Sequence, residues 1–273
     1  MTARNVFPDR RSFLKNLGLA SAGVGAALAS IRNGEAQTIS DADIVQFALN
    51  LEYLEAEFYT VARTGKTIDQ FGIGITGSGN AGPTTGGQKV TFIEGSTLAL
   101  SADEIAQDER EHVALLRQTL TSLGITPVAK PAINLNALGT GFESQEAFIN
   151  LARAFEDVGV SAYGGAAPLL QSKTILAAAA RILATEAEHT GNLRLHAALY
   201  QASTITVDGI DIAPPPSGKQ FFSTDSNGLT PVRTPGQVLY IVYGGNANAS
   251  AGGFFPNGVN GLLNTSSAAA SAS

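Results

Sequence analysis

Apolar residues recur at intervals of three and four positions along four long segments of the chain, which is the spacing of helices that bury one face. The segments cover residues 41–64, 101–123, 144–163 and 172–200. Ser40 with Asp43 has the spacing of a capping box at the first start, and Gly65 suits the end of that helix. Ser101 with Glu104 marks the second start in the same way. Four such helices predict an all-α fold, a four-helix bundle.

The segments between the helices differ in length and composition. Residues 65–100 are rich in Gly, Thr and Ser and are predicted to be a surface insertion with a short hairpin around residues 89–93. Residues 125–143 lack helical periodicity and, when extended, span well over ~30 Å, the length of a bundle. They predict a long crossover that makes the second and third helices parallel. Gly164-Gly165 is predicted to end the third helix.

The last part of the chain, residues 201–273, is rich in Gly, Asn and Pro. Its boundary is marked by three prolines at 214–216, and aromatic residues among the glycines predict a tail that wraps over the bundle. Residues 238–243 are apolar and are either a strand or a short helix. Residues 264–273 are Ser/Ala low complexity, which predicts disorder.

The first 36 residues are predicted to be a twin-arginine export signal. Residues 9–15, Asp-Arg-Arg-Ser-Phe-Leu-Lys, carry the signature, and a mildly apolar stretch follows at residues 17–31. This stretch is shorter and less apolar than the ~20 residues that cross a membrane, so an export signal is favoured over a permanent anchor. Cleavage after Ala29 and cleavage after Ala36 both fit the sequence. The protein is therefore expected in the periplasm or outside the cell, without a stable membrane anchor.

The charge balance excludes one large class of function. The chain has 17 Lys and Arg against 23 Asp and Glu, a net charge of −6. Without residues 1–36, which hold five basic and two acidic residues, 12 basic and 21 acidic residues remain, a net charge of −9. Binding to nucleic acid depends on neutralising phosphates, so no nucleic-acid partner is expected. The absence of cysteine from the sequence excludes disulfides, thiolate catalysis and sites built on thiolates.

One pattern of polar residues interrupts the apolar faces and is repeated in the two halves of the chain. Each half has a glutamate seven residues before a tyrosine, then a glutamate three residues before a histidine. The residues are Glu52, Tyr59, Glu109 and His112 in the first half, and Glu156, Tyr163, Glu186 and His189 in the second. These spacings are close to two turns and one turn, so each pair shares a helix face. Two single glutamates and two Glu-x-x-His pairs are the ligand set of a carboxylate-bridged two-metal site.

Other polar residues near this pattern are interpreted differently. Glu55 lies within the apolar stripe of the first helix, but Gly159 stands at its position in the second half, so the repeat selects Glu52 as the ligand. His196 lies two turns beyond His189 and is interpreted as a structural or supporting residue, with a ligand role as the lesser alternative. Asp108 is predicted to be an ordinary surface charge.

The donor set limits the metals and the chemistry. Four carboxylates and two imidazoles suit iron or manganese, whereas structural zinc sites favour cysteine. The four negative charges balance two divalent ions and would otherwise repel one another. We therefore predict two iron or two manganese ions, and redox chemistry with O2, peroxide or Fe(II). Tyr59 and Tyr163 are the candidate catalytic side chains, which would hydrogen-bond a ligand carboxylate, hold the shape of the site or donate an electron.

On these motifs, residues 41–200 resemble the ferritin-like superfamily. Within it, residues 50–59 (Asn-Leu-Glu-Tyr-Leu-Glu-Ala-Glu-Phe-Tyr) and the Gly-Gly-Phe-Phe-Pro sequence at 252–256 resemble bacterial ferritin-like-domain proteins related to plant desiccation-related proteins. The resemblance implies a ferritin-like bundle, dimetal ligands at the six Glu and His residues of the repeat, and a homodimer as one expected assembly. The insertion and the long tail depart from storage ferritins, which argues against an iron-storing shell.

Three functions follow from the sequence. The leading hypothesis is an exported dimetal protein that protects against stress through redox chemistry, as an oxidoreductase of the ferroxidase, peroxidase or catalase type. The alternative is a non-catalytic stress or desiccation-related scaffold with a vestigial metal site, and metal content separates these two. A third hypothesis is an enzyme similar to manganese catalases, which would release O2 from peroxide with manganese bound.

Overall fold

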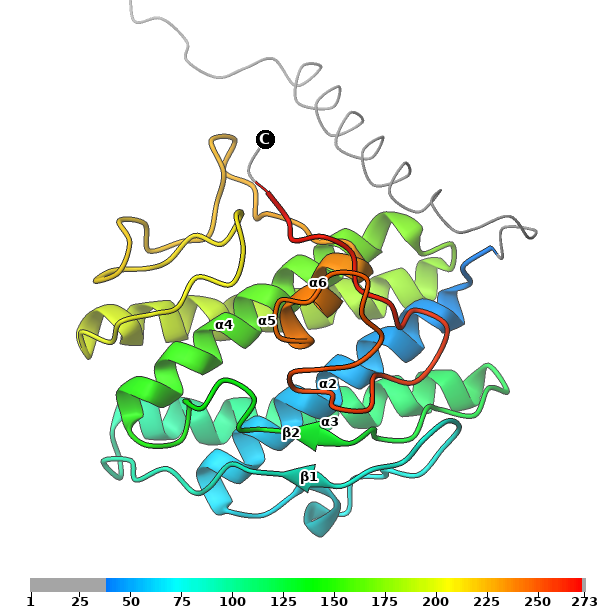
Figure 1. Cartoon of the computed structure of the whole chain (residues 1–273), viewed down its shortest axis with the longest axis horizontal. Helices are drawn as coiled ribbons and strands as arrows, with labels where there is room; N and C mark the ends of the chain where they lie inside the picture. The colour runs from blue at the N-terminus through cyan, green and yellow to red at the C-terminus, as the bar shows by residue number, and fades with distance from the viewer. Residues whose placement is uncertain (1–37, 272–273) are drawn as a thin grey trace, which may run out of the picture. The chain divides into compact units, whose positions relative to one another are not determined.

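Four long α-helices dominate the computed structural model, which describes residues 38–271 (Figure 1). They are α2 (Asp41–Thr64), α3 (Thr97–Ser122), α4 (Gln145–Ala166) and α5 (Lys173–Leu199). The shorter elements are the 3₁₀ turns η1 (Ile68–Phe71) and η2 (Ala167–Leu169), the strands β1 (Thr84–Thr85) and β2 (Ile133–Asn134), and helix α6 (Pro235–Val242). The all-α prediction is confirmed, while the predicted export signal lies outside the described residues. No helix in residues 38–271 is long and apolar enough to cross a membrane.

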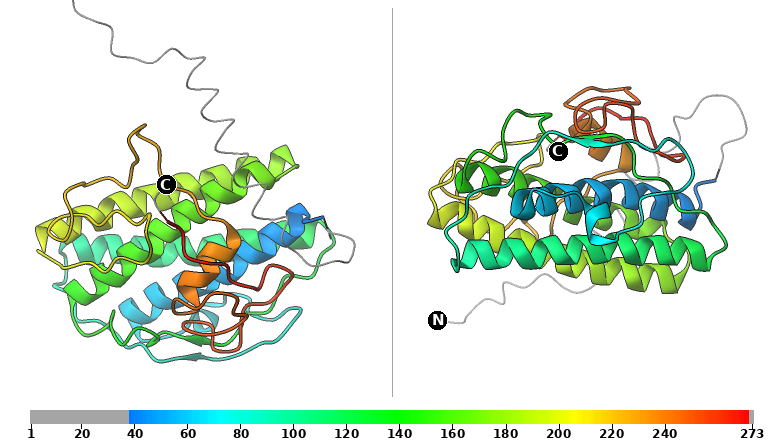
Figure 2. Two further views of the ribbon diagram at one scale, coloured as in Figure 1. Left: turned by 45° about the horizontal axis from the view of Figure 1, so that its top comes forward. Right: turned by 90° about the horizontal axis from the view of Figure 1, so that it is seen from below.

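The long helices run in the directions that the crossover predicts. Arg63 at the end of α2 pairs with Asp103 near the start of α3, with 2.7 Å between Nε and Oδ1, so these neighbours are antiparallel. Tyr59 late in α2 approaches Ala152 early in α4, so α2 and α4 are also antiparallel. It follows that α3 and α4 are parallel, and residues 123–144 carry the chain back along the bundle (Figure 2).

Three helix starts and one helix end lie at the predicted boundaries, and each is capped there. Ser40 and Asp43 form a reciprocal capping box at α2, and Gly65 ends that helix with φ 72°. Ser144 and Ser172 cap α4 and α5 through side chains that accept a hydrogen bond from the third residue of each helix. Each cap satisfies a backbone N–H that the helix itself leaves free.

The start of α3 was predicted at the wrong serine. The helix begins at Thr97, one turn earlier, with Ser96 as its cap. Ser101 lies inside the helix, where its hydroxyl donates to the Thr97 carbonyl oxygen at 2.8 Å. The extra turn is held because Leu98 is completely buried against the other helices.

The two glycines expected to end α4 lie inside it instead. The helix continues through Gly164 and Gly165 to Ala166. A Cβ atom at position 165 would lie 2.0 Å from the carbonyl oxygen of Arg233. Gly165 therefore permits close packing of the tail against α4 and does not terminate the helix.

The insertion pairs with the crossover and not with itself. Strand β1 lies parallel to β2, with Thr84 opposite Ile133 and Thr85 opposite Asn134. The hairpin predicted around residues 89–93 is wrong, since that part of the described chain forms no strand. Val90 is buried there, and its N–H donates to the Ala62 carbonyl oxygen of α2 at 2.8 Å.

The tail lies on the face of the bundle formed by α2 and α4, with α3 on the opposite side (Figure 2). Residues 238–243 were predicted to form a strand or a short helix. They form a helix, since residues 238–242 belong to α6 (Pro235–Val242). Asn260 exchanges hydrogen bonds with Asn50 of α2 and also bonds to Asn80 and to the Ala129 carbonyl oxygen, with donor–acceptor distances of 2.8–3.0 Å. The backbone of this one residue thus joins the tail to α2, and its side chain joins the tail to the insertion and the crossover.

The end of the tail is packed, contrary to the disorder predicted for residues 264–273. Ser266 and Ala270 are buried, and the Ser266 N–H donates to the Ala249 carbonyl oxygen at 2.8 Å. The composition of this segment is simple, but its backbone finds partners on other parts of the tail. The prediction therefore fails for residues 264–271.

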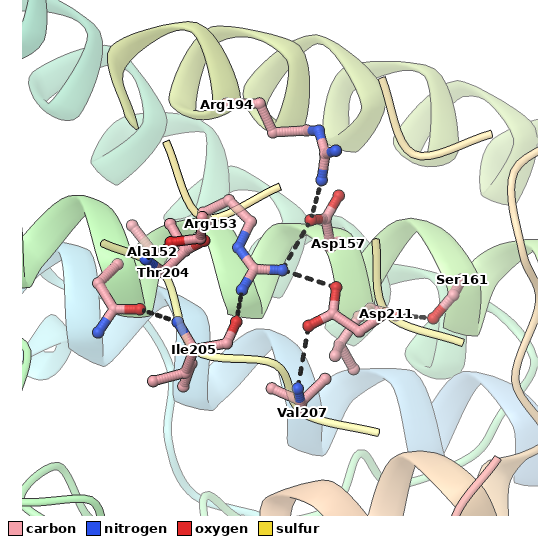
Figure 3. A network of polar contacts seen from close by, with 12 residues as sticks. Ala152, Arg153, Asp157, Ser161, Arg194, Thr204, Ile205, Val207 and Asp211 are labelled. Carbon is pink, nitrogen blue, oxygen red and sulfur yellow. Dashed lines mark hydrogen bonds and ion pairs between the residues drawn. The ribbon is translucent and has the colours of Figure 1, made fainter. Parts of the chain in front are cut away.

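A buried network of charges fixes the first part of the tail to α4 and α5 (Figure 3). Arg153 contacts Asp211 of the tail at 2.7 Å and Asp157 at 3.2 Å, and it also donates to the Ile205 carbonyl oxygen. Arg194 contacts Asp157 at 2.7 Å. Both arginines are completely buried, so each depends on these partners for the stabilisation that water would otherwise provide.

Candidate metal centre

The six predicted metal ligands meet in the interior of the bundle, and each is more than nine-tenths buried. Their donor atoms form two overlapping groups, in each of which the atoms lie within 4.8 Å of one another. The groups are Glu52, Glu109, His112 and Glu186, and Glu109, Glu156, Glu186 and His189. Glu109 and Glu186 belong to both groups. These two carboxylates are therefore shared by the two groups, and each of the other four residues belongs to one group.

The two histidines mark the centres of the groups. His112 Nδ1 lies 3.3 Å from Glu52 Oε2 and 3.3 Å from Glu186 Oε1. His189 Nδ1 lies 3.2 Å from Glu109 Oε1 and 3.2 Å from Glu156 Oε2. Each Nδ1 thus faces carboxylate oxygens from other helices, which is the convergence that the two-turn and one-turn spacings predict.

Many donor atoms in this cluster lie close to one another without forming a hydrogen bond of good geometry. The buried oxygen and nitrogen atoms without a hydrogen bond in residues 38–271 include Glu52 Oε2, Glu156 Oε1, His112 Nδ1 and both carboxylate oxygens of Glu109 and Glu186. Leaving polar atoms buried and unpaired costs several kcal/mol, on the order of 2–7 for each neutral group. Since carboxylate oxygen and imidazole nitrogen suit iron and manganese, the residues present fit two such ions.

Burial makes the bridging carboxylates hard to ionise without a metal. It raises the pKa of Glu109 to about 7, and repulsion from Glu52 and Glu156 adds to this while hydrogen bonds with the histidines oppose it. The pKa of Glu186 is raised well above its ordinary value by burial and by repulsion from Glu109 and Glu156. Cations at the site would favour the charged forms of both groups.

The same carboxylates raise the pKa values of the two histidines, against the effect of burial. Burial by itself lowers the pKa of His189, but Glu156 and Glu109 outweigh it and raise that pKa to about 12. For His112, burial again lowers the pKa, and Glu52, Glu109 and Glu186 raise it far above the ordinary value. In the metal-free cluster, the histidines are therefore protonated, and their positive charges offset the negative charges of the carboxylates. Metal binding must displace them.

The two candidate tyrosines approach different groups. The Tyr163 hydroxyl donates a hydrogen bond to Glu52 Oε1 across the bundle. The Tyr59 hydroxyl donates weakly to the Ala152 carbonyl oxygen at 3.5 Å. Burial raises the pKa of both tyrosines well above the ordinary value, with Glu156 adding to the effect on Tyr59 and Glu52 to that on Tyr163. Both tyrosines therefore stay protonated at neutral pH and act as hydrogen-bond donors.

Two residues of the site were missed by the sequence reasoning. Asp108, predicted to be a surface charge, lies with Oδ2 3.2 Å from His189 Nε2 and can orient that ring. Glu55 is 6% exposed and also faces the cluster, opposite Gly159. A Cβ atom at position 159 would lie 2.7 Å from Glu186 Oε2 and 3.2 Å from Glu55 Oε1. The sequence repeat already indicated this arrangement, because Gly159 stands at the position of Glu55 and a glycine leaves room for a carboxylate.

His196 lies apart from the cluster and has partners of its own. Its Nε2 is 3.1 Å from the Thr97 hydroxyl, and its Nδ1 is 3.0 Å from the Asn192 carbonyl oxygen. The Nε2 atom thus contacts α3, and the Nδ1 atom contacts the preceding turn of α5. This arrangement agrees with the structural interpretation of His196.

Comparison with known proteins adds two findings. Residues 40–199, which include all four long helices, match the ferritin-like domain family. A ferritin-like catalase, Nec2, from Nesocodon mauritianus is 24% identical to this chain over 275 residues. The alignment covers 82% of this chain and 85% of the relative.

Proposed function

The chain belongs to the ferritin-like domain family, and from this premise we propose that it is a dimetal oxidoreductase that acts on peroxide, dioxygen or Fe(II). The observation that carries the proposal is the pair of overlapping groups of buried carboxylate and imidazole atoms. A scaffold with a merely structural bundle gains nothing from unpaired buried charges, because apolar residues of similar size would cost less.

The residues divide into holding and orienting roles. Glu109 and Glu186 would lie between two iron or two manganese ions, while Glu52 with His112 and Glu156 with His189 would hold one ion each. When bound, such a pair supplies redox chemistry of one electron per ion. Tyr163 keeps the Glu52 carboxylate in place by donating to its other oxygen.

Catalase-type turnover is the specific reaction with additional support. A relative that aligns over most of both chains carries the name ferritin-like catalase. In that reaction two peroxide molecules yield two water molecules and one dioxygen, so the site needs no separate reductant.

Metal content is the first test. Elemental analysis of the purified protein should find about two iron or manganese ions per chain, and Glu109→Ala and His189→Ala should each lose them. Glu111→Ala is the matched control, because Glu111 is exposed and only two residues from Glu109. Metal-free protein that stays folded and refuses both Fe(II) and Mn(II) would refute the proposal and favour the stress or desiccation-related scaffold.

Turnover is the second test. Protein loaded with either metal is mixed with hydrogen peroxide, and dioxygen release is followed with an oxygen electrode. Rapid release by the manganese form, lost in His189→Ala, would establish catalase-type activity. Loaded protein that releases no dioxygen but oxidises Fe(II) would make it a ferroxidase.

Export belongs to the same proposal and rests on the twin arginines alone. We propose that residues 1–36 direct the folded protein out of the cytoplasm, so that it acts in the periplasm or outside the cell. Replacing Arg10 and Arg11 by lysine should retain the protein in the cytoplasmic fraction. Unchanged export of that variant would contradict this part of the proposal.

A further inference from the structure

The interior of the bundle is filled differently on the two sides of the candidate metal centre. On the side of Tyr59, aromatic rings pack closely around Phe58, with ring centroids 5.1–5.5 Å from those of Tyr59, Phe142, Phe148 and Phe155. Rings packed in this way leave little free space. These rings therefore fill the interior of the bundle on this side of the centre.

On the side of Tyr163 a cavity lies between the helices. Residues of α2, α3, α4 and α5 line it, and many of them are small: Ala48, Ala162, Ala166, Ala178 and Ala179. Its volume is about 50 Å³, which is room for a few water-sized molecules, since one such molecule needs roughly 10–15 Å³ on this measure. All five alanines are partly exposed, so the cavity lies close to the surface of the bundle.

The internal repeat shows which side chains make the difference. The alignment that pairs Glu52 with Glu156 also pairs Phe58 with Ala162. By the same alignment, Phe148 and Phe155 on the filled side correspond to Ile44 and Leu51 on the cavity side. Three aromatic rings on one side are thus replaced by an alanine and two aliphatic residues on the other.

The inner end of the cavity reaches the candidate centre. Glu52, Glu55 and Tyr163 line that end, while the remaining walls are almost entirely apolar. Glu55 is more than nine-tenths buried and is one of the few polar side chains that line the cavity. A cavity with apolar walls that ends at residues of the candidate centre indicates a place where a small molecule is received.

We propose that this cavity is the binding pocket and passage for dioxygen, as a reactant or as a product of the dimetal centre. The inference rests on the proposed function and names the substrate class of the same site. Apolar walls exclude a hydrated metal ion, which would lose its water without gaining ligands. They also offer hydrogen peroxide no partners along the way, and the volume is too small for a long acyl chain. Dioxygen is small, neutral and apolar, and meets all three conditions.

Xenon provides a test that needs neither metal nor activity, because it binds in apolar cavities of this kind. In crystals of the mature protein under xenon pressure, the atom should occupy the cavity between Ala162 and Ala178. Ala162→Phe, which installs the residue found at the paired position 58, and Ala178→Phe should both abolish binding. Ala177→Phe is the matched control, since Ala177 is the adjacent residue on the exposed face of α5. An empty cavity in the wild type, or xenon retained in both plugged variants, would overturn the proposal.

Reaction with dioxygen is the second measurement. In metal-loaded, reduced protein, both plugged variants should react with dioxygen more slowly by on the order of tenfold, as expected when access limits a rate. Their metal content should stay at the wild-type value, and Ala177→Phe should react at the wild-type rate. An unchanged rate in folded, metal-loaded plugged variants would overturn the role as a passage. Protein that binds xenon but holds no metal would instead refute the proposed function, while the cavity would still be a binding site for a small apolar molecule.

Discussion

At the scale of single residues, the repeat contains two tyrosines whose contacts are unequal. Tyr163 donates directly to a ligand carboxylate, Glu52. Tyr59 donates to a backbone oxygen at 3.5 Å, lies near enough to Glu156 for that carboxylate to raise its pKa, and packs against Phe58 and Phe148. Residues that orient a metal ligand commonly contribute about 10–100-fold to metal affinity. The two positions should therefore respond differently to the same substitution.

Tyr163→Phe should weaken metal binding by about tenfold or more, because Glu52 loses the donor that fixes its orientation. Tyr59→Phe keeps the aromatic packing and should change the affinity much less. Equilibrium dialysis with Mn(II) measures both variants. Equal losses in the two would show that the tyrosine contacts do not distinguish the two halves of the site.

The same scale shows how far the sequence predicts the site. The six candidate ligands could be predicted because two helical spacings occur twice, which chance rarely produces. Asp108 was predicted to lie on the surface and Glu55 was set aside in favour of Glu52, because only the packing of the helices shows that their side chains meet the cluster. Helical spacing tells which residues share a face, but the partner of that face is set by tertiary packing.

At the scale of elements, Gly165 and Gly191 offer a matched pair of glycines in helices α4 and α5. A Cβ atom at 165 would lie 2.0 Å from the Arg233 carbonyl oxygen, whereas one at 191 would have nothing within 4 Å. Gly165→Ala should destabilise the protein by about 1–3 kcal/mol through overpacking. Gly191→Ala should stabilise it by about 0.5–1 kcal/mol, because alanine loses less entropy in a helix. Urea denaturation of both variants tests this, and a stable Gly165→Ala protein would mean that the tail is not tightly docked.

The elements that the sequence predicted correctly are those with local signals. Ser40, Gly65, Ser144 and Ser172 cap their helices through contacts within four residues, which the sequence displays directly. The failures involve distant partners: the extra turn of α3 depends on where Leu98 is buried, and β1 pairs with a strand on another loop. Two-residue strands have no periodicity of their own to detect.

At the scale of the whole molecule, the buried network of Arg153, Asp157, Arg194 and Asp211 connects the tail to the bundle. Asp211→Ala removes one partner and leaves Arg153 with an incompletely compensated charge. Removing one partner of a buried pair costs about 3–5 kcal/mol. Glu188→Ala, an exposed acidic residue on α5, should change stability by less than about 0.5 kcal/mol. Denaturation midpoints compare the two, and a shift in Asp211→Ala no larger than the control would show that the tail adds little to the stability of the bundle.

The charge of the metal centre also governs the stability of the whole protein. Folding raises the pKa of Glu109 to about 7 from its ordinary 4.5. A raised pKa contributes stability that is complete below the unfolded value and is lost as pH rises through the folded value. The raised pKa of His189 acts in the same direction above its ordinary 6.5. The metal-free protein should therefore lose stability between pH 4.5 and 7, by on the order of 3 kcal/mol from Glu109 alone.

Metal binding should reverse this dependence on pH. Two cations stabilise the ionised carboxylates and the neutral imidazoles. The loaded folded protein therefore binds fewer protons than the unfolded chain, and its stability rises with pH. Urea denaturation at pH 5, 6, 7 and 8 should show stability falling for chelator-treated protein and rising for loaded protein. Glu109→Gln cannot ionise at that position, so its metal-free form should lose a large part of the slope below pH 7. Parallel curves for loaded and metal-free protein would mean that the cluster does not exchange protons for metal ions.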